Sequence, residues 1–220
     1  MRTRKLLLPA RRNLEAFDYT DPMPFCYQPI LGWFFRRRLE IGLELLEADS
    51  YPKLLEIGFG SGLLFKTLAS LAQDIHGVDI HPKIAQVEGM LRREGLAATL
   101  TAGDILHLDF PIDSFDAVVC FSVLEHIADT DRAIAEVSRV LKPNGVAILG
   151  FPAVNRTMSF FFHSIGVHDI DARHVSGGNK ILASCRRFMQ VERVRRLPWF
   201  LPPGAALYVA CKCRKIQLQG

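Results

Sequence analysis

Residues 53–62 read KLLEIGFGSG, an apolar run that ends in three closely spaced glycines. The apolar half is short enough to be a buried strand of a parallel sheet. The glycines predict a tight turn in which backbone N–H groups can approach a ligand, because no β-carbon stands in the way. Leucines recur at helical spacing over residues 63–73, where we expect a helix. A strand, a glycine turn and a helix are typical of a nucleotide-binding α/β unit.

The spacing of this loop is Glu56-x-Gly58-x-Gly60-x-Gly62. It differs from the Gly-x-Gly-x-x-Gly pattern of dinucleotide-binding loops, since Leu63 stands at the position of the third glycine. A glycine loop alone also fits a plain strand-to-helix turn without a ligand. Its interpretation therefore depends on the residues that come later in the chain.

Composition favours one globular α/β domain with a full core. The chain has 220 residues, of which 49% are hydrophobic and 23% charged. Its net charge of +4 permits contact with an anionic surface. The sequence has no basic stripe with interleaved aromatic residues, which argues against a nucleic-acid partner.

The five cysteines are scattered and odd in number, which favours a reducing compartment. We interpret the one close pair, Cys211 and Cys213, as buried thiols, and we predict no metal site. The run Leu6-Leu7-Leu8 is too short for a signal peptide core, and no apolar run reaches membrane-spanning length. We expect a cytoplasmic protein and leave its oligomeric state open.

Strands and helices alternate along the rest of the chain, which implies a parallel sheet with helices on both faces. We divide the chain into an N-terminal cap segment, residues 1–50, and a domain, residues 51–220, with a lid insertion at about 152–179. Residues 36–38, Arg-Arg-Arg, are interpreted as a solvated helix face in preference to a phosphate contact. The expected strands are 75–80, 98–102, 114–121, 146–151, 191–197 and 206–213; the expected helices are 30–47, 82–94, 130–141 and 180–188; residues 142–145 are an expected turn.

Several polar residues fall at the carboxyl ends of these strands, where parallel sheets bind ligands. Asp79 ends the second strand and can accept hydrogen bonds from two ribose hydroxyls; it can also cap the next helix. Asp104 follows the third strand and can accept a bond from an exocyclic amine. Residues 122–126 leave the fourth strand. These residues and Gly58 are expected to meet at one edge of the sheet.

Six short motifs occur in order between residues 53 and 152. They resemble the motifs of class I S-adenosylmethionine-dependent methyltransferases, in particular the small-molecule branch that includes quinone-biosynthesis enzymes. The motifs are Glu56-Ile57-Gly58-Phe59-Gly60-Ser61-Gly62, Gly77-Val78-Asp79, Gly103-Asp104-Ile105, Phe115-Asp116-Ala117-Val118, Leu124-Glu125-His126-Ile127 and Arg139-Val140-Leu141-Lys142-Pro143-Asn144-Gly145.

The resemblance implies a Rossmann-like, doubly wound sheet of seven strands, the last antiparallel. It also implies S-adenosylmethionine as cofactor, with its methionine part against Gly58, Gly60 and Gly62. The remaining cofactor roles it implies are these: Glu56 orients the amino group, Asp79 holds the ribose, Asp104 holds the adenine amine, Ile80 and Ile105 sandwich the adenine, and Ser122 completes the set.

His126 and His174 are the candidate general bases, should the acceptor have to lose a proton. His163 and His168 rank below them, and for any single one of the four an ordinary loop or capping histidine is the favoured interpretation. Aromatic residues gather in the N-terminal segment and in residues 160–162. They favour a small apolar or aromatic methyl acceptor, or else they only pack the cap.

Two other functions remain open at this point. One is a methyltransferase fold without activity that serves as a binding or scaffold protein. The other is a nicotinamide oxidoreductase, which the loop spacing and Asp104 disfavour. A basic arm formed by Arg2, Arg4, Lys5, Arg11 and Arg12 would suit peripheral contact with an anionic membrane.

Overall fold

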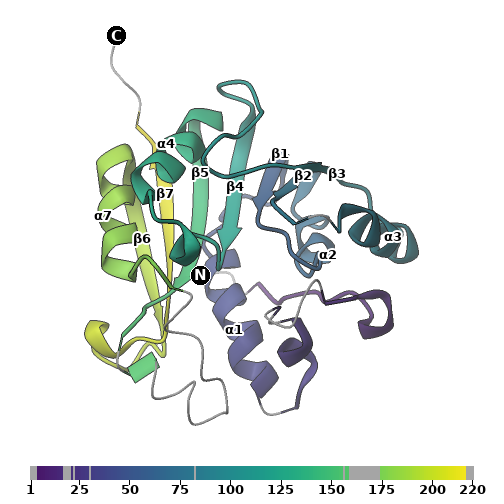
Figure 1. Ribbon diagram of the computed structural model, residues 1–220, viewed down its shortest axis with the longest axis horizontal. Helices are drawn as coiled ribbons and strands as arrows, with labels where there is room; N and C mark the ends of the chain where they lie inside the picture. The colour runs from purple at the N-terminus through teal and green to yellow at the C-terminus, as the bar shows by residue number, and fades with distance from the viewer. Residues whose placement is uncertain are drawn as a thin grey trace.

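The computed structural model describes residues 4–16, 21, 23–29, 31–81, 83–155, 157–158 and 174–216. These residues form one seven-stranded sheet in the order β3-β2-β1-β4-β5-β7-β6 (Figure 1). β7 pairs antiparallel with β5 and β6, and the other pairs are parallel. The predicted fold class is confirmed. The strands are β1 Tyr51–Ile57, β2 Ala72–Asp79, β3 Thr99–Ala102, β4 Phe115–Phe121, β5 Leu141–Pro152, β6 Met189–Leu197 and β7 Tyr208–Lys215.

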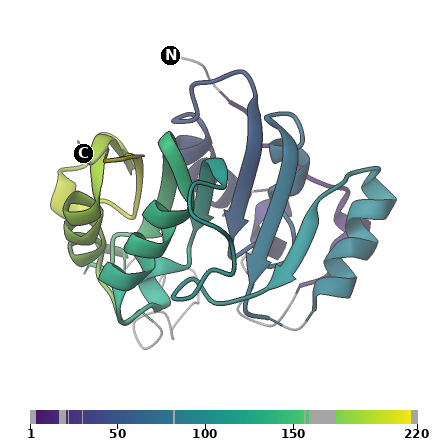
Figure 2. The same ribbon diagram turned by 90° about the horizontal axis from the view of Figure 1, so that it is seen from above.

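Helices cover both faces of the sheet. α1, α2 and α3 pack on one face and α4 and α7 on the other, with α3 near the β3 edge and α7 near the β6 edge (Figures 1 and 2). The bounds are α1 Leu31–Leu43, α2 Phe65–Leu68, α3 Ile84–Glu94, α4 Thr130–Val140 and α7 Gly178–Phe188; the short 3₁₀ turns are η1 Arg11–Asn13, η2 Met23–Tyr27, η3 Leu124–His126 and η4 Pro203–Ala205.

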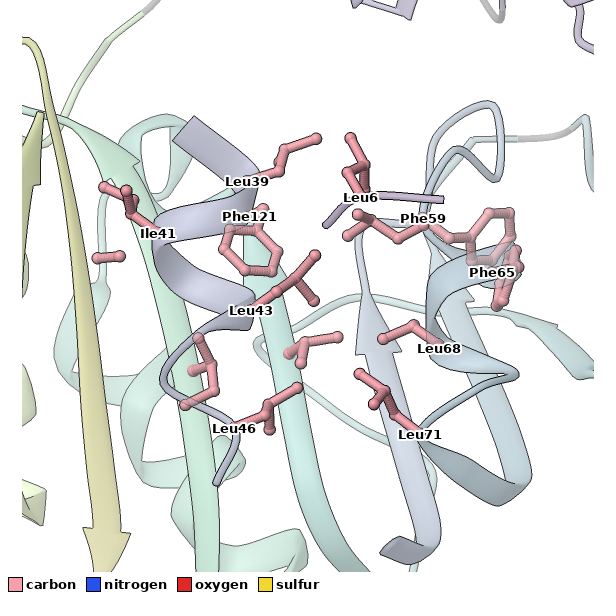
Figure 3. Close-up of a cluster of buried hydrophobic side chains, with 14 of the residues drawn as sticks. Leu6, Leu39, Ile41, Leu43, Leu46, Phe59, Phe65, Leu68, Leu71 and Phe121 are labelled. Carbon is pink, nitrogen blue, oxygen red and sulfur yellow. The ribbon is translucent and has the colours of Figure 1, made fainter. Parts of the chain in front are cut away.

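The two faces divide the core because side chains alternate along each strand. In β4, Val119 and Phe121 point to the α1 side, whereas Val118 and Cys120 point to the α4 side. Figure 3 shows Phe121 beneath α1, among side chains from α1 and from the N-terminal segment. The N-terminal segment therefore contributes directly to the main core. The division into a cap and a domain stays a prediction.

Most elements differ from their predicted bounds by a few residues, and three differ more. The helix expected at residues 63–73 is only the four residues of α2, and β2 begins already at Ala72. Ser70 and Leu71 instead form turns that bond back to Thr67 and Leu68. The turns still bury the periodic leucines, which is why the sequence pattern suggested a long helix.

The first helix ends at Leu43, earlier than the predicted residue 47, and turns continue the chain to Leu46. The turn expected at residues 142–145 is a bulge inside β5. Phe115 pairs with Leu141 and Ala117 with Val146, so the ladder continues on both sides of the extra residues. Among the described residues, no helix is long and apolar enough to cross a membrane.

Candidate active site

The glycine loop links β1 to α2 and has the backbone geometry that requires glycine. Gly58, Gly60 and Gly62 have φ angles of 76°, 50° and 81°, in the left-handed region that other residues rarely adopt. A β-carbon on Gly58 would lie 2.1 Å from Cγ2 of Val123. The loop is thus folded tightly against the segment that leaves β4.

Asp79 fixes this loop from the end of β2. Its carboxylate accepts hydrogen bonds from the backbone N–H of Gly60 at 2.8 Å and of His81 at 3.2 Å. The alternative role predicted for it is wrong, because the N-cap of α3 is Lys83. Its predicted ribose contact stays a prediction. The structure shows that Asp79 holds the glycine loop at the carboxyl end of β2.

Glu56 is a buried acid without a partner. Its side chain is 3% exposed, and Oε2 has no hydrogen-bond partner among the described residues. Burial, with a smaller contribution from the charge of Asp79, raises the pKa of Glu56 well above its usual value. Buried polar atoms are normally paired. A ligand ammonium group would supply the missing partner, so Glu56 and the glycine loop fit S-adenosylmethionine.

The residues predicted to hold the adenine lie beside the same edge. Asp104 accepts a hydrogen bond from the N–H of Leu106 at 2.9 Å, which fixes the turn after β3. Ile80 is 79% exposed, whereas Ile105 is buried in the core. Their adenine contacts stay predictions.

A second polar cluster lies where β4 and β5 end. Ser122 has a left-handed φ of 57° and donates its N–H to Gly150 of β5 at 2.7 Å. Its hydroxyl lies 3.4 Å from Nη1 of Arg38 and 3.2 Å from the Tyr208 hydroxyl. The prediction that the arginine triplet is solvated is therefore wrong for Arg38, which is buried because α1 turns that side chain towards the sheet. Arg36 and Arg37 are half-buried.

Glu125 and two histidines complete this cluster. The Glu125 side chain is 2% exposed, and burial raises its pKa to about 8 even though Arg38 lowers it. Backbone N–H groups of Val175 and Ser176 donate to the Glu125 carbonyl at 2.9 and 3.1 Å. They bring His174 to His126, with ring centroids 5.5 Å apart. The structure thus places the two candidate bases together; His163 and His168 lie outside the described residues.

Sequence reasoning missed Arg38, Glu125 and Tyr208. Glu125 stands next to His126 in a quoted motif, so the signal for it was present. Arg38 and Tyr208 lie far from that motif in the chain, and only the pairing of β7 with β5 brings Tyr208 opposite Pro152 at the site. No local pattern could have joined them.

Among the described residues, two groups of side chains have metal-binding donors within 4.8 Å of one another: Glu125, His126 and His174, and the three buried thiols of Cys185, Cys211 and Cys213. The second group lies in the core between α7 and β7. The thiols of Cys211 and Cys213 are buried, as predicted, and Cys185 is an unforeseen neighbour. The prediction that the protein has no metal site stays untested.

Comparison with known proteins agrees with this geometry. A family model described as a methyltransferase domain matches residues 55–149, from the apolar strand before the glycine loop to the end of the β4–β5 region. This stretch of the chain, from β1 to β5, is thus similar to a methyltransferase domain. The matched residues include all six motifs quoted from the sequence.

Among curated proteins, the chain is similar to a ubiquinone biosynthesis O-methyltransferase of Xanthomonas oryzae pv. oryzae, with 30% identity over 120 residues, which are 50% of this chain and 46% of that protein. It is also 30% identical over 104 residues to a demethylmenaquinone methyltransferase of Tropheryma whipplei, covering 46% of this chain and 42% of that protein. The chain thus spans about half the length of these relatives.

Solved structures share the fold of this chain at low identity. The N-methyltransferase NodS of Bradyrhizobium japonicum, in complex with S-adenosylhomocysteine, has a TM-score of 0.65 at 17% identity, covering 91% of this chain and 95% of that one. The [4+2]-cyclase SpnF also has a TM-score of 0.65, at 19% identity, covering 81% and 80%. Because one of these proteins is named a cyclase, the fold alone does not decide the reaction.

Proposed function

We propose that this protein is an S-adenosylmethionine-dependent methyltransferase that acts on a small, quinol-like or otherwise aromatic acceptor. The observation that carries the proposal is the unpartnered Glu56 carboxyl beside a glycine loop held by Asp79. The methyltransferase family match over the same residues supports it. The quinone-pathway names of the relatives support the acceptor class.

The cofactor supplies a methyl group that is already activated on a sulfonium. The protein therefore has mainly to bind, align and exclude water, effects that can contribute roughly 7–11 kcal/mol. In this proposal Gly58, Gly60 and Gly62 receive the methionine part and Glu56 its amino group. Asp79 and Asp104, from neighbouring strand ends, hold the ribose and the adenine, which lies between Ile80 and Ile105.

Proton removal from the acceptor falls to His126 or His174 in this proposal. The ring of His126 is about half exposed, and the two rings are in contact at the end of β4. A positioned base of this kind typically contributes 10²–10⁴-fold in rate. Ser122 precedes Val123, which packs against Gly58 of the glycine loop, and we assign Ser122 to the cofactor.

Peripheral membrane contact is a further part of the proposal. Arg4 of the basic arm donates to the carbonyls of Leu46 and Ala48. Lys5, Arg11 and Arg12 are exposed and can face a membrane, and Arg2 lies outside the described residues. Trp199 and Phe200, 84% and 67% exposed, lie between β6 and β7, and aromatic side chains suit a membrane interface. Co-sedimentation with anionic vesicles should weaken when Trp199 and Phe200 are replaced by Ala; wild-type protein that stays in the supernatant would contradict this part.

Thermal melting with S-adenosylhomocysteine or NAD separates the three candidate functions. A ligand at ~100 times its dissociation constant should raise Tm by about 5–10 °C for a protein of this size. We expect this rise with S-adenosylhomocysteine and none with NAD. A rise with NAD alone would favour an oxidoreductase, and no rise with either ligand would favour a scaffold protein.

A further inference from the structure

Arg38 is a buried cation, and most of the N–H donors of its guanidinium make no hydrogen bond within the described residues. Its side chain is 9% exposed, and its guanidinium lies over the rings of Phe35 and Tyr208, at 5.0 and 5.8 Å from their centroids. Its one hydrogen bond within the described structure, to the Ser122 hydroxyl, is long at 3.4 Å. Nε is buried and has no partner among the described residues. No carboxylate among the described residues forms an ion pair with Arg38, whereas the neighbouring Arg37 pairs with Glu44.

A lone buried guanidinium is unfavourable, because buried charges are normally paired. The charge of Arg38 lowers the pKa of Glu125, but no hydrogen bond joins the two side chains among the described residues. Burial keeps the pKa of Glu125 at about 8, so this side chain is mostly neutral at pH 7. Its Oε2 is also buried and without a partner in the described structure. The cluster therefore has net positive charge and unused hydrogen-bonding capacity.

The position of this cluster points to a ligand of the reaction. Ser122 follows β4, and Tyr208 lies opposite the last residue of β5. Val123, the next residue after Ser122, packs against Gly58 of the cofactor loop. Ligands of such sheets bind outside the carboxyl ends of the strands. Ser122 is also held in a left-handed conformation, a kind of strain that is common at binding sites.

We infer that Arg38 binds an anionic oxygen of the methyl acceptor, so that the acceptor is an acidic small molecule, a carboxylate or a phenolate. This inference rests on the proposed methyltransferase function. A guanidinium offers two parallel N–H groups to a carboxylate, which makes charge-assisted hydrogen bonds that are stronger than neutral ones. The aromatic rings of Phe35 and Tyr208 on either side suit an aromatic acid.

The test compares matched charged and neutral probes. In the presence of saturating S-adenosylhomocysteine, calorimetric titration of wild-type protein should show benzoate binding more tightly than benzamide. Arg38→Met should weaken benzoate binding by about 10- to 100-fold, the usual effect of one charge-assisted hydrogen bond, and leave benzamide unchanged. Arg37→Met, a control on the same helix, should leave both unchanged. A second titration compares ionised 4-nitrophenol with neutral 4-nitroanisole, and it tells whether the site prefers a phenolate to a carboxylate.

Stability without ligand gives a second readout. Arg38→Met removes a buried charge without an ion-pair partner, so its Tm should equal or exceed that of wild type, and Arg38→Lys should keep part of the benzoate binding. Any of four results would overturn the inference. Wild-type protein could bind benzoate and benzamide equally, or bind neither. Arg38→Met could bind benzoate as tightly as wild type does, or have a lower Tm than wild type. Failure of wild-type protein to bind S-adenosylhomocysteine would instead refute the proposed function.

Discussion

At the scale of single residues, Glu125 shows how burial sets the charge of the site. Its pKa of about 8 lies above the ordinary value near 4.5, and desolvation is the main cause. The charge of Arg38 opposes this shift but does not cancel it. The cluster at the end of β4 is therefore an electropositive one at neutral pH, in spite of its acid.

The raised pKa makes a prediction for stability against pH. A carboxyl that is protonated in the folded state contributes stability fully below pH 4.5, and this contribution is lost as pH rises towards about 8. The stability of wild type relative to Glu125→Gln should thus fall over this range, by on the order of 4 kcal/mol. Chemical denaturation of both proteins between pH 5 and 9 measures it.

Glu136 supplies a control of opposite sign. Hydrogen bonds from Arg139 hold the pKa of Glu136 below its usual value, so its contribution is present above pH 4.5 and is lost only as pH falls below it. The stability difference between wild type and Glu136→Gln should therefore stay flat from pH 5 to 9. A flat curve for Glu125→Gln as well would show that Glu125 is ionised in the folded protein.

At the scale of elements, the loop between β1 and α2 depends on glycine for two separate reasons. Gly58 has a left-handed φ of 76°, and its β-carbon would collide with Val123. Gly95, which ends α3, has a similar φ of 67° but open space around it. Substitution by Ala at Gly95 should cost about 1 kcal/mol of unfolding free energy. At Gly58 overpacking adds to the strain, and we expect about 3 kcal/mol.

Urea unfolding of Gly58→Ala and Gly95→Ala without ligand measures this difference. Equal losses would mean that residues 122–123 move aside easily. In that case the loop and the end of β4 would not form one rigid site.

Element types were predictable from the sequence where periodicity and length agreed, as in β1, β4 and α4. The prediction failed at α2, because turns rather than a long helix bury the leucines at helical spacing. The helix is short because β2 already pairs with β1 from Ala72 on. Asp79 was singled out because strand ends are readable from the chain, whereas Glu56 came from the family resemblance; the cofactor roles of both stay predictions. Arg38 was misassigned because the buried side of α1 depends on its packing against the sheet, which no local pattern contains.

At the scale of the whole molecule, ion pairs join the N-terminal segment to β6 at the sheet edge. Arg195 pairs with Glu44, whose side chain is 3% exposed, and Arg193 pairs with Glu47, which is about half exposed. Arg195→Met should cost about 2 kcal/mol because it leaves a buried carboxylate short of a partner. Arg193→Met should cost less than about 1 kcal/mol, as exposed pairs do.

Guanidinium unfolding curves of these two variants test how firmly the N-terminal residues belong to the fold. A single transition in both, shifted mainly in Arg195→Met, is the expected result. A separate early transition in Arg195→Met would show that the N-terminal segment unfolds independently, as a distinct cap would.

The glycine loop and the acids at the strand ends should together bind the cofactor. The sharpest test is calorimetric titration of S-adenosylhomocysteine into wild type, Asp79→Ala and Asp74→Ala. Asp79 holds the loop, whereas Asp74 lies on the same strand and, within the described part of the chain, its side chain contacts only His76 and Lys53. We predict 1:1 binding to wild type and to Asp74→Ala, and binding at least ~10-fold weaker to Asp79→Ala. No binding to wild type, or equal binding to all three proteins, would show that these residues do not form a cofactor site.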